Sequence, residues 1–339
     1  MTPTEDGLNA LNPEVESSRP SADPPGEEEV ARVLELVGRF RNEMGKVYLG
    51  SSNVPDRILM CLLAGGHVLL EGVPGVAKTT LVRAFAQCLD AGFRRIQFTP
   101  DLLPADITGT MVLDPRTGEF TLRRGPLFAS VVLGDEINRA PAKTQSALLE
   151  AMQERQVTID GETRLLPSPW MVLATQNPVE QEGVYVLPEA QLDRFLMRLR
   201  VGYPDERQEV AMLSAHGARP PMPQTVLDGE GVVELQRLAE RVLVSSAISA
   251  YIVRLVRRTR RLDEVILGAS PRASLALLRA SRSRALLRGR DYVNVDDVRE
   301  VAVPVLAHRL VLSPGAALGE VNEESLIERA VREVPYDPA

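Results

Sequence analysis

Short apolar runs alternate with apolar stripes of helical spacing through the first two thirds of the chain. A run of this kind predicts a buried strand, and a stripe predicts a helix that packs on the sheet. Strands that alternate with helices favour a mostly parallel sheet with helices on its faces. The runs that predict strands are residues 67–71, 94–98, 130–136, 170–175 and 195–199. The stripes that predict helices are residues 30–40, 55–65, 79–89 and 142–155.

Two pairs of β-prone segments flank turn-forming residues and predict β-hairpins. The first pair surrounds residues 114–118, and the second surrounds the Asp-Gly turn at residues 160–161. The polar residues 101–109, which contain Pro104, predict a loop before the first hairpin. The paired segments are residues 110–113 with 119–122, and residues 157–159 with 163–166.

The pattern changes after residue 204. Residues 216–228 are rich in proline, which favours a connection between domains. Beyond them the apolar positions follow helical spacing, and no segment predicts a strand. We therefore expect a small, all-helical second domain. Its helices are expected at residues 232–244, 247–262, 271–288, 294–309 and 323–333.

The first 28 residues contain five prolines, no aromatic residue and a single basic residue, Arg19. Such a segment cannot bury enough apolar surface to offset its ordering entropy, so we expect it to be disordered. The predicted organisation is an acidic tail over residues 1–28, an α/β domain with two inserted hairpins over 29–207, a linker over 208–229 and an all-helical domain over 230–339.

Composition narrows the possible functions. The formal net charge of -7 argues against binding to bulk nucleic acid or to an acidic membrane. No apolar run approaches the ~18–20 residues that span a bilayer, and acidic residues stand where a signal peptide would be positive. We therefore expect a cytoplasmic protein without membrane insertion. The two cysteines, Cys61 and Cys88, lie in apolar helical segments and predict buried free thiols, and the three histidines show no metal-ligand spacing.

A glycine-rich connection joins the first predicted strand to the next helix. This strand–loop–helix context is typical of a phosphate-binding loop, because the helix N-terminus directs free N–H groups at an anion. Lys78 is expected to reach the β- and γ-phosphates of ATP, and the Thr79 hydroxyl to bind Mg²⁺. The usual pattern has a glycine where this chain has Ala77. The candidate nucleotide-binding residues are Gly72, Val73, Pro74, Gly75, Val76, Ala77, Lys78, Thr79 and Thr80.

Polar residues follow two other predicted strands. Ligands of open α/β sheets bind at the carboxyl ends of the strands, which places Asp135 and Glu136 beside the phosphates. We expect Asp135 to hold Mg²⁺, Glu136 to polarise the attacking water and Asn177 to contact that water and the γ-phosphate. Taken singly, each signal also fits a plain turn or a solvated strand end. Their order on successive strand ends favours nucleotide binding.

Residues 47–310 resemble the MoxR-type AAA+ ATPases. In this family alanine is common at the position of Ala77, so the resemblance accommodates it. Two departures are Leu49-Gly50-Ser51, where relatives have Gly-Gln after an apolar residue, and Gly134, where a larger residue is commoner. The stretches that carry the resemblance are residues 62–79, 97–109, 135–154, 174–178, 187–195 and 268–272.

The resemblance implies a P-loop AAA+ core followed by a small helical lid, in a ring of usually six copies with nucleotide at the subunit interfaces. Arg194 matches the arginine finger, which would reach the neighbouring subunit's γ-phosphate. Arg272 matches the sensor-2 arginine, and its action on its own or its neighbour's nucleotide stays open. The hairpins match the helix-2 insert (110–127) and the pre-sensor-1 hairpin (157–166), which face partners at the ring surface and pore.

Three functions remain in view. The resemblance implies a chaperone that remodels or matures a partner, often a protein with a von Willebrand factor A domain or a metalloenzyme. A nucleic-acid motor is the alternative, because several arginines share one face of a predicted lid helix; a solvated or subunit-contacting face explains them as well. A nucleotide switch with little turnover fits poorly, because the candidate hydrolytic residues are all present. The arginines in question are Arg254, Arg257, Arg258 and Arg261.

Overall fold

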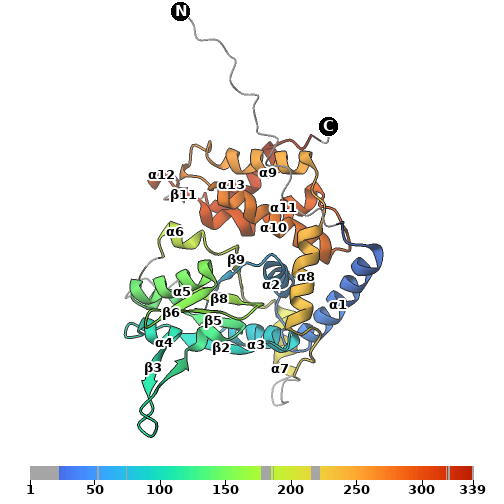
Figure 1. Ribbon diagram of the computed structural model, residues 1–339. Coiled ribbons are helices and arrows are strands. Elements are labelled where there is room, and N and C mark those ends of the chain that lie inside the picture. Colours follow the sequence, from blue (N-terminus) through green and yellow to red (C-terminus); the bar gives the residue numbers. More distant parts are fainter. Residues whose placement is uncertain are drawn as a thin grey trace, which may run out of the picture.

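The computed structural model describes residues 23–51, 53–73, 75–176, 185, 187–214, 222–317, 319 and 321–337. These residues form an α/β domain with a helical domain packed above it (Figure 1). Most of the expected disordered tail, residues 1–22, lies outside this description. The tail's expected last residues differ from the structure, because helix α1 (Glu27–Gly45) already begins at Glu27.

A five-stranded parallel sheet forms the centre of the α/β domain, as the apolar runs predict. Its strand order is β2-β5-β8-β1-β9, so the strand before the glycine-rich loop lies inside the sheet. Parallel pairing joins every neighbouring pair of strands. The strands are β1 (Val68–Glu71), β2 (Phe93–Gln97), β5 (Val131–Asp135), β8 (Met171–Gln176) and β9 (Met197–Arg200).

The sheet separates two apolar cores. Val68, Leu70 and Leu133 point into one core, which also holds the buried faces of helices α1, α2 (Asn53–Leu63) and α3 (Lys78–Cys88). Leu69 and Val132 point into the other core, against α5 (Ala142–Glu154). Strands that are buried on both faces read as continuous apolar runs, which is why the sequence predicts them.

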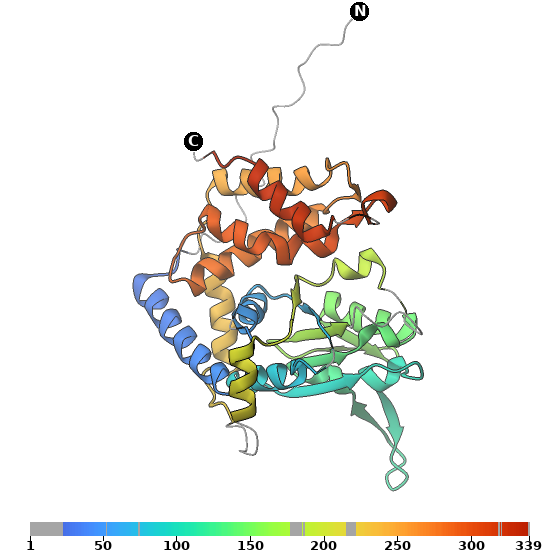
Figure 2. The ribbon, with the colours of Figure 1, turned by 180° about the vertical axis from the view of Figure 1, so that it is seen from behind.

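Both predicted hairpins are present. Strand β3 (Gly109–Leu113) pairs with β4 (Phe120–Arg124), and β6 (Gln156–Ile159) pairs with β7 (Glu162–Leu165), both antiparallel. From behind, the β3–β4 hairpin extends away from the body of the domain (Figure 2). Short 3₁₀ turns at Pro126–Phe128 and Ile137–Arg139 follow β4 and β5.

The prediction of a loop over residues 101–109 is wrong for its second half. Helix α4 (Pro104–Thr108) forms there, with Pro104 in its first turn. The Leu103 backbone N–H donates to the Asp106 carboxylate at 2.9 Å, which caps the helix. A helix of five residues is too short to show apolar positions repeated at helical spacing, so the sequence pattern could not reveal it.

The C-terminal region is helical, as expected, but it also contains a small sheet. Strand β10 (Val265–Leu267) pairs antiparallel with β11 (Val311–Leu312). These strands have three and two residues, too few to show alternation. Helix α7 (Glu206–Ser214) crosses the expected start of the linker at residue 208. The remaining helices are α6 (Glu189–Leu192), α8 (Gly229–Arg241), α9 (Ser246–Thr259), α10 (Pro271–Leu287), α11 (Val295–Leu306), the 3₁₀ turn η4 (Ala307–Arg309), α12 (Pro314–Ala317) and α13 (Glu323–Glu333).

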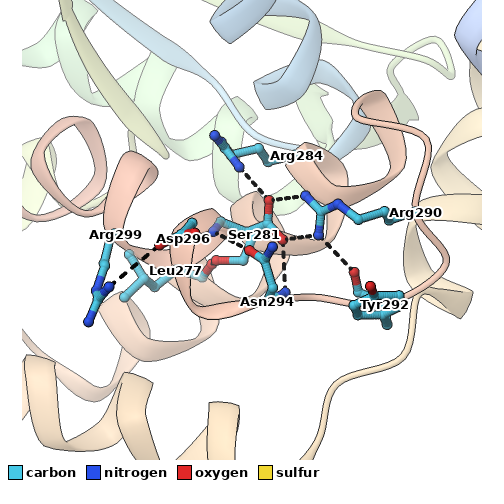
Figure 3. Close-up of polar contacts among 9 residues, drawn as sticks. Leu277, Ser281, Arg284, Arg290, Tyr292, Asn294, Asp296 and Arg299 are labelled. Atoms are coloured by element: carbon cyan, nitrogen blue, oxygen red, sulfur yellow. Dashed lines mark hydrogen bonds and ion pairs between the residues drawn. The ribbon is translucent and has the colours of Figure 1, made fainter. Parts of the chain in front are cut away.

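A buried carboxylate fixes the corner between α10 and α11. Asp297 is fully buried and accepts hydrogen bonds from Arg284 at 2.5 Å and from Arg290 at 2.6 Å. Figure 3 shows the side chains of Arg284 and Arg290 converging near Asn294. The Asn294 backbone N–H also donates to it, as part of the N-terminal cap of α11. A buried charge persists only when its oxygens are paired, so this cluster holds the lid helices α10 and α11 in one geometry.

Candidate functional site

The glycine-rich loop joins β1 to α3, as the sequence predicts. Gly75 has a φ of 86°, and Ala77 has a φ of 59° as the N-cap of α3. Both values lie in the left-handed region that favours glycine, which explains why glycine is the usual residue at the position of Ala77. The Lys78 ammonium donates to the Gly72 carbonyl at 2.6 Å, so the loop curls around its own lysine. Pro74 lies outside the described residues.

The Lys78 side chain is half-buried beside two carboxylates. Burial lowers its pKa, while the charges of Asp135 and Glu136 act in the opposite direction. The three side chains therefore share one electrostatic environment at the carboxyl edge of the sheet. The last residue of β5 and the residue after it therefore lie in the neighbourhood of the glycine-rich loop, at the edge where open α/β sheets bind ligands.

Asp135 ends β5 with both carboxylate oxygens engaged. The Thr175 hydroxyl on β8 donates to Oδ1 at 2.6 Å, and Arg95 on β2 donates to Oδ2 from Nε at 3.0 Å. The neighbouring strands set this arrangement, because Gln97 pairs with Asp135 and Gly134 with Ala174. The sequence pattern alone predicts no role for Arg95 or Thr175.

Glu136 follows β5 in a left-handed conformation, with a φ of 58°. Its backbone N–H donates to the Thr175 hydroxyl at 2.9 Å, and its carboxylate accepts a hydrogen bond from Gln97 at 2.8 Å. Arg139 lies 3.4 Å from the same carboxylate. The strained turn positions the backbone, and Gln97 and Arg139 fix the direction of the carboxylate. The residue expected beside it, Asn177, lies outside the described residues.

Arg194 and Arg272 lie at the edge of the sheet opposite to Lys78. Gly72 follows β1, whereas His67 precedes it, and His67 lines a cavity of about 230 Å³ together with Arg194 and Arg272. Because all five strands are parallel, their amino ends share one edge. The structure therefore does not bring Arg194 or Arg272 to Lys78 of the same chain. The other charged residues that line this cavity are Arg155, Asp193, Arg279 and Arg309.

The buried His67 and the half-buried Arg155 build one wall of this cavity. Arg155 donates to the carbonyls of Gly65 and Trp170 at 2.5 Å each and stacks on the Trp170 ring. His67 Nδ1 accepts a hydrogen bond from the Val172 N–H at 3.0 Å, so its Nε2 carries the proton shared with the Met152 carbonyl at 3.2 Å. Burial lowers the pKa of His67 to about 3.

The depressed pKa of His67 predicts an acid-sensitive fold. An unfolded histidine takes up a proton below pH ~6.5, whereas folded His67 stays neutral down to about pH 3. The stability that this histidine contributes is therefore complete above pH 6.5 and is lost as the pH falls, by about 2 kcal/mol between pH 7.5 and 5. Urea unfolding at a series of pH values measures this loss.

His67→Gln is the matched variant for this measurement. It should unfold with a shallower pH dependence than the parent, and the buried His308, whose pKa is also lowered by burial, should supply the dependence that remains. A parental slope in His67→Gln would show that His67 does not govern the acid response.

Arg254 and Arg258, two of the four arginines on the basic face of α9, contact other parts of the chain, as does the C-cap residue Arg260. Arg258 pairs with Glu333 at 2.8 Å, Arg254 donates to the Pro335 carbonyl, and Arg260 donates to the Ala269 carbonyl. These contacts join α9 to α13 and to the start of α10. They support the interpretation of this face as structural rather than as a nucleic-acid surface.

The described part of the chain shows neither a membrane-spanning helix nor a metal-binding cluster. None of its helices combines the length and the apolar character needed to cross a membrane. Nor does it contain a cluster of three or more histidine, cysteine, aspartate or glutamate residues that could hold a metal ion. Mg²⁺ bound with a nucleotide needs no such cluster, because phosphates and water supply most of its ligands.

Comparison with known proteins agrees with this geometry. Residues 67–197 match the family described as "ATPase family associated with various cellular activities (AAA)", and residues 257–330 match the AAA lid domain. A solved structure from Cytophaga hutchinsonii, of a protein described as an ATPase, is 40% identical with a TM-score of 0.86. The match covers 92% of this chain and 98% of the solved chain.

Two named relatives extend the match over nearly the whole chain. Chaperone MoxR1 of Mycobacterium tuberculosis is 47% identical over 92% of this chain and 85% of its own length. Protein MoxR of Methylorubrum extorquens is 30% identical over 91% of this chain and 96% of its own length. The chain therefore belongs to the MoxR-type AAA+ ATPase family.

Proposed function

We propose that this protein is an ATP-hydrolysing chaperone of the cytoplasm that works as a ring. It binds ATP between neighbouring subunits and uses hydrolysis to remodel or mature a partner protein. One observation carries the proposal. Lys78, Asp135 and Glu136 lie at the carboxyl edge of the sheet, whereas Arg194 and Arg272 lie at its amino edge.

The division of the site between two edges favours a head-to-tail assembly. A complete hydrolytic site needs positive charge on the γ-phosphate as well as a phosphate loop and a carboxylate. A second copy can supply Arg194 and Arg272 when its amino edge meets the carboxyl edge of the first. Repetition of one such contact closes into a ring, for which the family resemblance suggests six copies. On this arrangement Arg272 acts on its neighbour's nucleotide.

Thr79 and Asp135 would hold Mg²⁺. A hydroxyl and a carboxylate are the hard oxygen ligands that this ion prefers, and nucleotide phosphates supply the others. Bound Mg²⁺ would neutralise charge on the phosphates. Arg95 shares the Asp135 carboxylate, so it keeps that carboxylate charge-paired and oriented.

Glu136 would polarise the attacking water. Its carboxylate is fixed by Gln97 and by Arg139 rather than free to rotate, which is the preorganisation that a water-activating group requires. Asn177, which follows β8 in the sequence, would contact the same water and the γ-phosphate. The Lys78 ammonium would turn from the Gly72 carbonyl to the phosphates.

The hairpins would engage the client. They carry apolar side chains that a monomer exposes at a cost: Phe120 is 66% exposed and Leu165 is 77% exposed. Val112 and Leu113 add to the β3–β4 hairpin. The chaperone name of the Mycobacterium tuberculosis relative supports a protein client. By resemblance, this client is a protein with a von Willebrand factor A domain or a metalloenzyme.

A trapped complex tests this proposal. Glu136→Gln, loaded with ATP in a cell extract, should retain its client because ATP stays bound without hydrolysis. Lys78→Ala is the matched control, because it should bind no ATP and therefore retain no client. Mass spectrometry of both samples identifies proteins enriched only with Glu136→Gln. Nuclease-sensitive enrichment of DNA or RNA would instead favour a nucleic-acid motor.

A further inference from the structure

The carboxylate of Asp193 connects the lid to the segment that carries Arg194. Asp193 lies between α6 and β9, directly before Arg194. Its Oδ1 accepts a hydrogen bond from Arg309 Nε at 2.7 Å, and its Oδ2 accepts one from the Ser270 hydroxyl at 3.4 Å. Ser270 is the N-cap of α10 and stands two residues before Arg272. One carboxylate thus connects the backbone segments that carry Arg194 and Arg272.

Arg309 reinforces this connection from within the lid. Its side chain is only 3% exposed. Besides the carboxylate, its guanidinium donates to the carbonyls of Asp193 at 3.3 Å, Phe195 at 2.8 Å and Leu196 at 3.3 Å. These contacts fall on both sides of Arg194. The backbone around Arg194 is therefore held by η4 of the lid rather than by the sheet alone.

The two arginine side chains themselves are lightly held. Arg194 donates to Gln153 at 3.3 Å, a long hydrogen bond. Arg272 is exposed, and its side chain makes no hydrogen bond or ion pair with any other residue that the structure describes. Their tips can thus move to a ligand, while their backbones are fixed to each other through Asp193. Both residues line the same cavity.

We propose that Asp193 and Arg309 are positioning residues that make Arg194 and Arg272 a single unit coupled to the lid. This inference rests on the proposed action of Arg194 on the neighbouring subunit's ATP. Any rotation of the lid moves both arginines together relative to that ATP. The lid position of one subunit therefore sets the hydrolysis rate in the next. A displacement of about 1 Å can reduce catalysis ~10²-fold, so the coupling need not be large to act as a switch.

Asp193→Asn tests the coupling, because it keeps the side-chain shape and removes the charge that holds Arg309. The variant should bind ATP with parental affinity through its intact Lys78 and lose turnover by about tenfold. Arg309→Lys is a second test, because lysine keeps the charge but cannot bond the carboxylate and three carbonyls together. It should show the same split between binding and turnover.

Mixed rings separate positioning from a general structural role. Lys78→Ala subunits cannot hydrolyse ATP but carry intact arginines. When they are mixed with Asp193→Asn subunits, turnover should return at each site where an Asp193→Asn subunit binds ATP and a Lys78→Ala subunit supplies the arginines. Arg194→Ala is mixed with Lys78→Ala in parallel. The matched control is Glu264→Gln, which removes a lid-internal ion pair with Arg329 at 2.7 Å. It should lower the melting temperature and leave turnover unchanged.

The outcomes distinguish the two ideas. Restoration in both mixtures supports the coupling. Restoration with Arg194→Ala but not with Asp193→Asn overturns the coupling and still supports the proposed sharing of the site between subunits. Restoration in neither mixture overturns the proposed sharing of the site, and the coupling with it. Parental turnover of the Asp193→Asn ring also overturns the coupling.

Discussion

Replacing Arg194 with alanine should abolish most ATP turnover while ATP binding stays close to parental. An arginine that neutralises transition-state charge on a γ-phosphate contributes about 10³–10⁵-fold to the rate. Arg194 lies at the far edge of the sheet from its own Lys78, so its loss removes nothing from the pocket in which its own subunit binds ATP. Phosphate release measures turnover, and a fluorescent nucleotide analogue measures binding.

Arg257→Ala is the matched control for this variant. Arg257 is exposed on α9, away from the cavity that holds Arg194, and its loss should change neither turnover nor binding. If Arg194→Ala instead bound ATP weakly and turned over the bound fraction at the parental rate, Arg194 would belong to its own subunit's binding pocket.

Glu136→Gln should lower turnover by about 10²–10⁴-fold, the range that a positioned general base supplies. Glutamine preserves the size of the side chain and can still meet Gln97, but it cannot draw a proton from water. ATP should therefore accumulate on the variant, and the purified protein should carry ATP rather than ADP. Single-turnover hydrolysis with excess enzyme isolates the chemical step from product release.

Two control variants accompany Glu136→Gln. Glu150→Gln alters an exposed carboxylate on α5 and should keep parental turnover. Lys78→Ala should lose ATP binding itself, so that bound ATP is absent rather than trapped. A Glu136→Gln protein that turned over ATP at the parental rate would exclude Glu136 as the water-activating residue.

The sequence predicts the parts of the site that lie along single segments. The loop from Gly72 to Thr79, and the acidic pair at the end of β5, follow from apolar runs that end in glycine or carboxylates. Their strands are buried on both faces, which makes the runs continuous. The α/β fold is confirmed for the same reason. The helical second domain is also confirmed, because its apolar positions follow helical spacing.

The parts that depend on lateral neighbours could not be predicted. Arg95 and Thr175 reach Asp135 from β2 and β8, and only the strand order and register place them there. The location of Arg194 and Arg272 at the amino edge follows from the direction of the parallel strands. Their roles come from family resemblance, and only the three-dimensional arrangement separates them from Lys78 of the same chain.

The strand order has a consequence for how this chain is made. Strand β1 emerges from the ribosome early, yet both of its sheet partners, β8 and β9, come much later in the chain. The first of them is 105 residues away, the separation between His67 and Val172. At translation speeds of about 5–20 residues per second, β1 waits for several seconds with its apolar side chains unpaired. The glycine-rich loop thus gains its rigid support, and with it the capacity to hold a nucleotide, only after more than half of the protein has been synthesised.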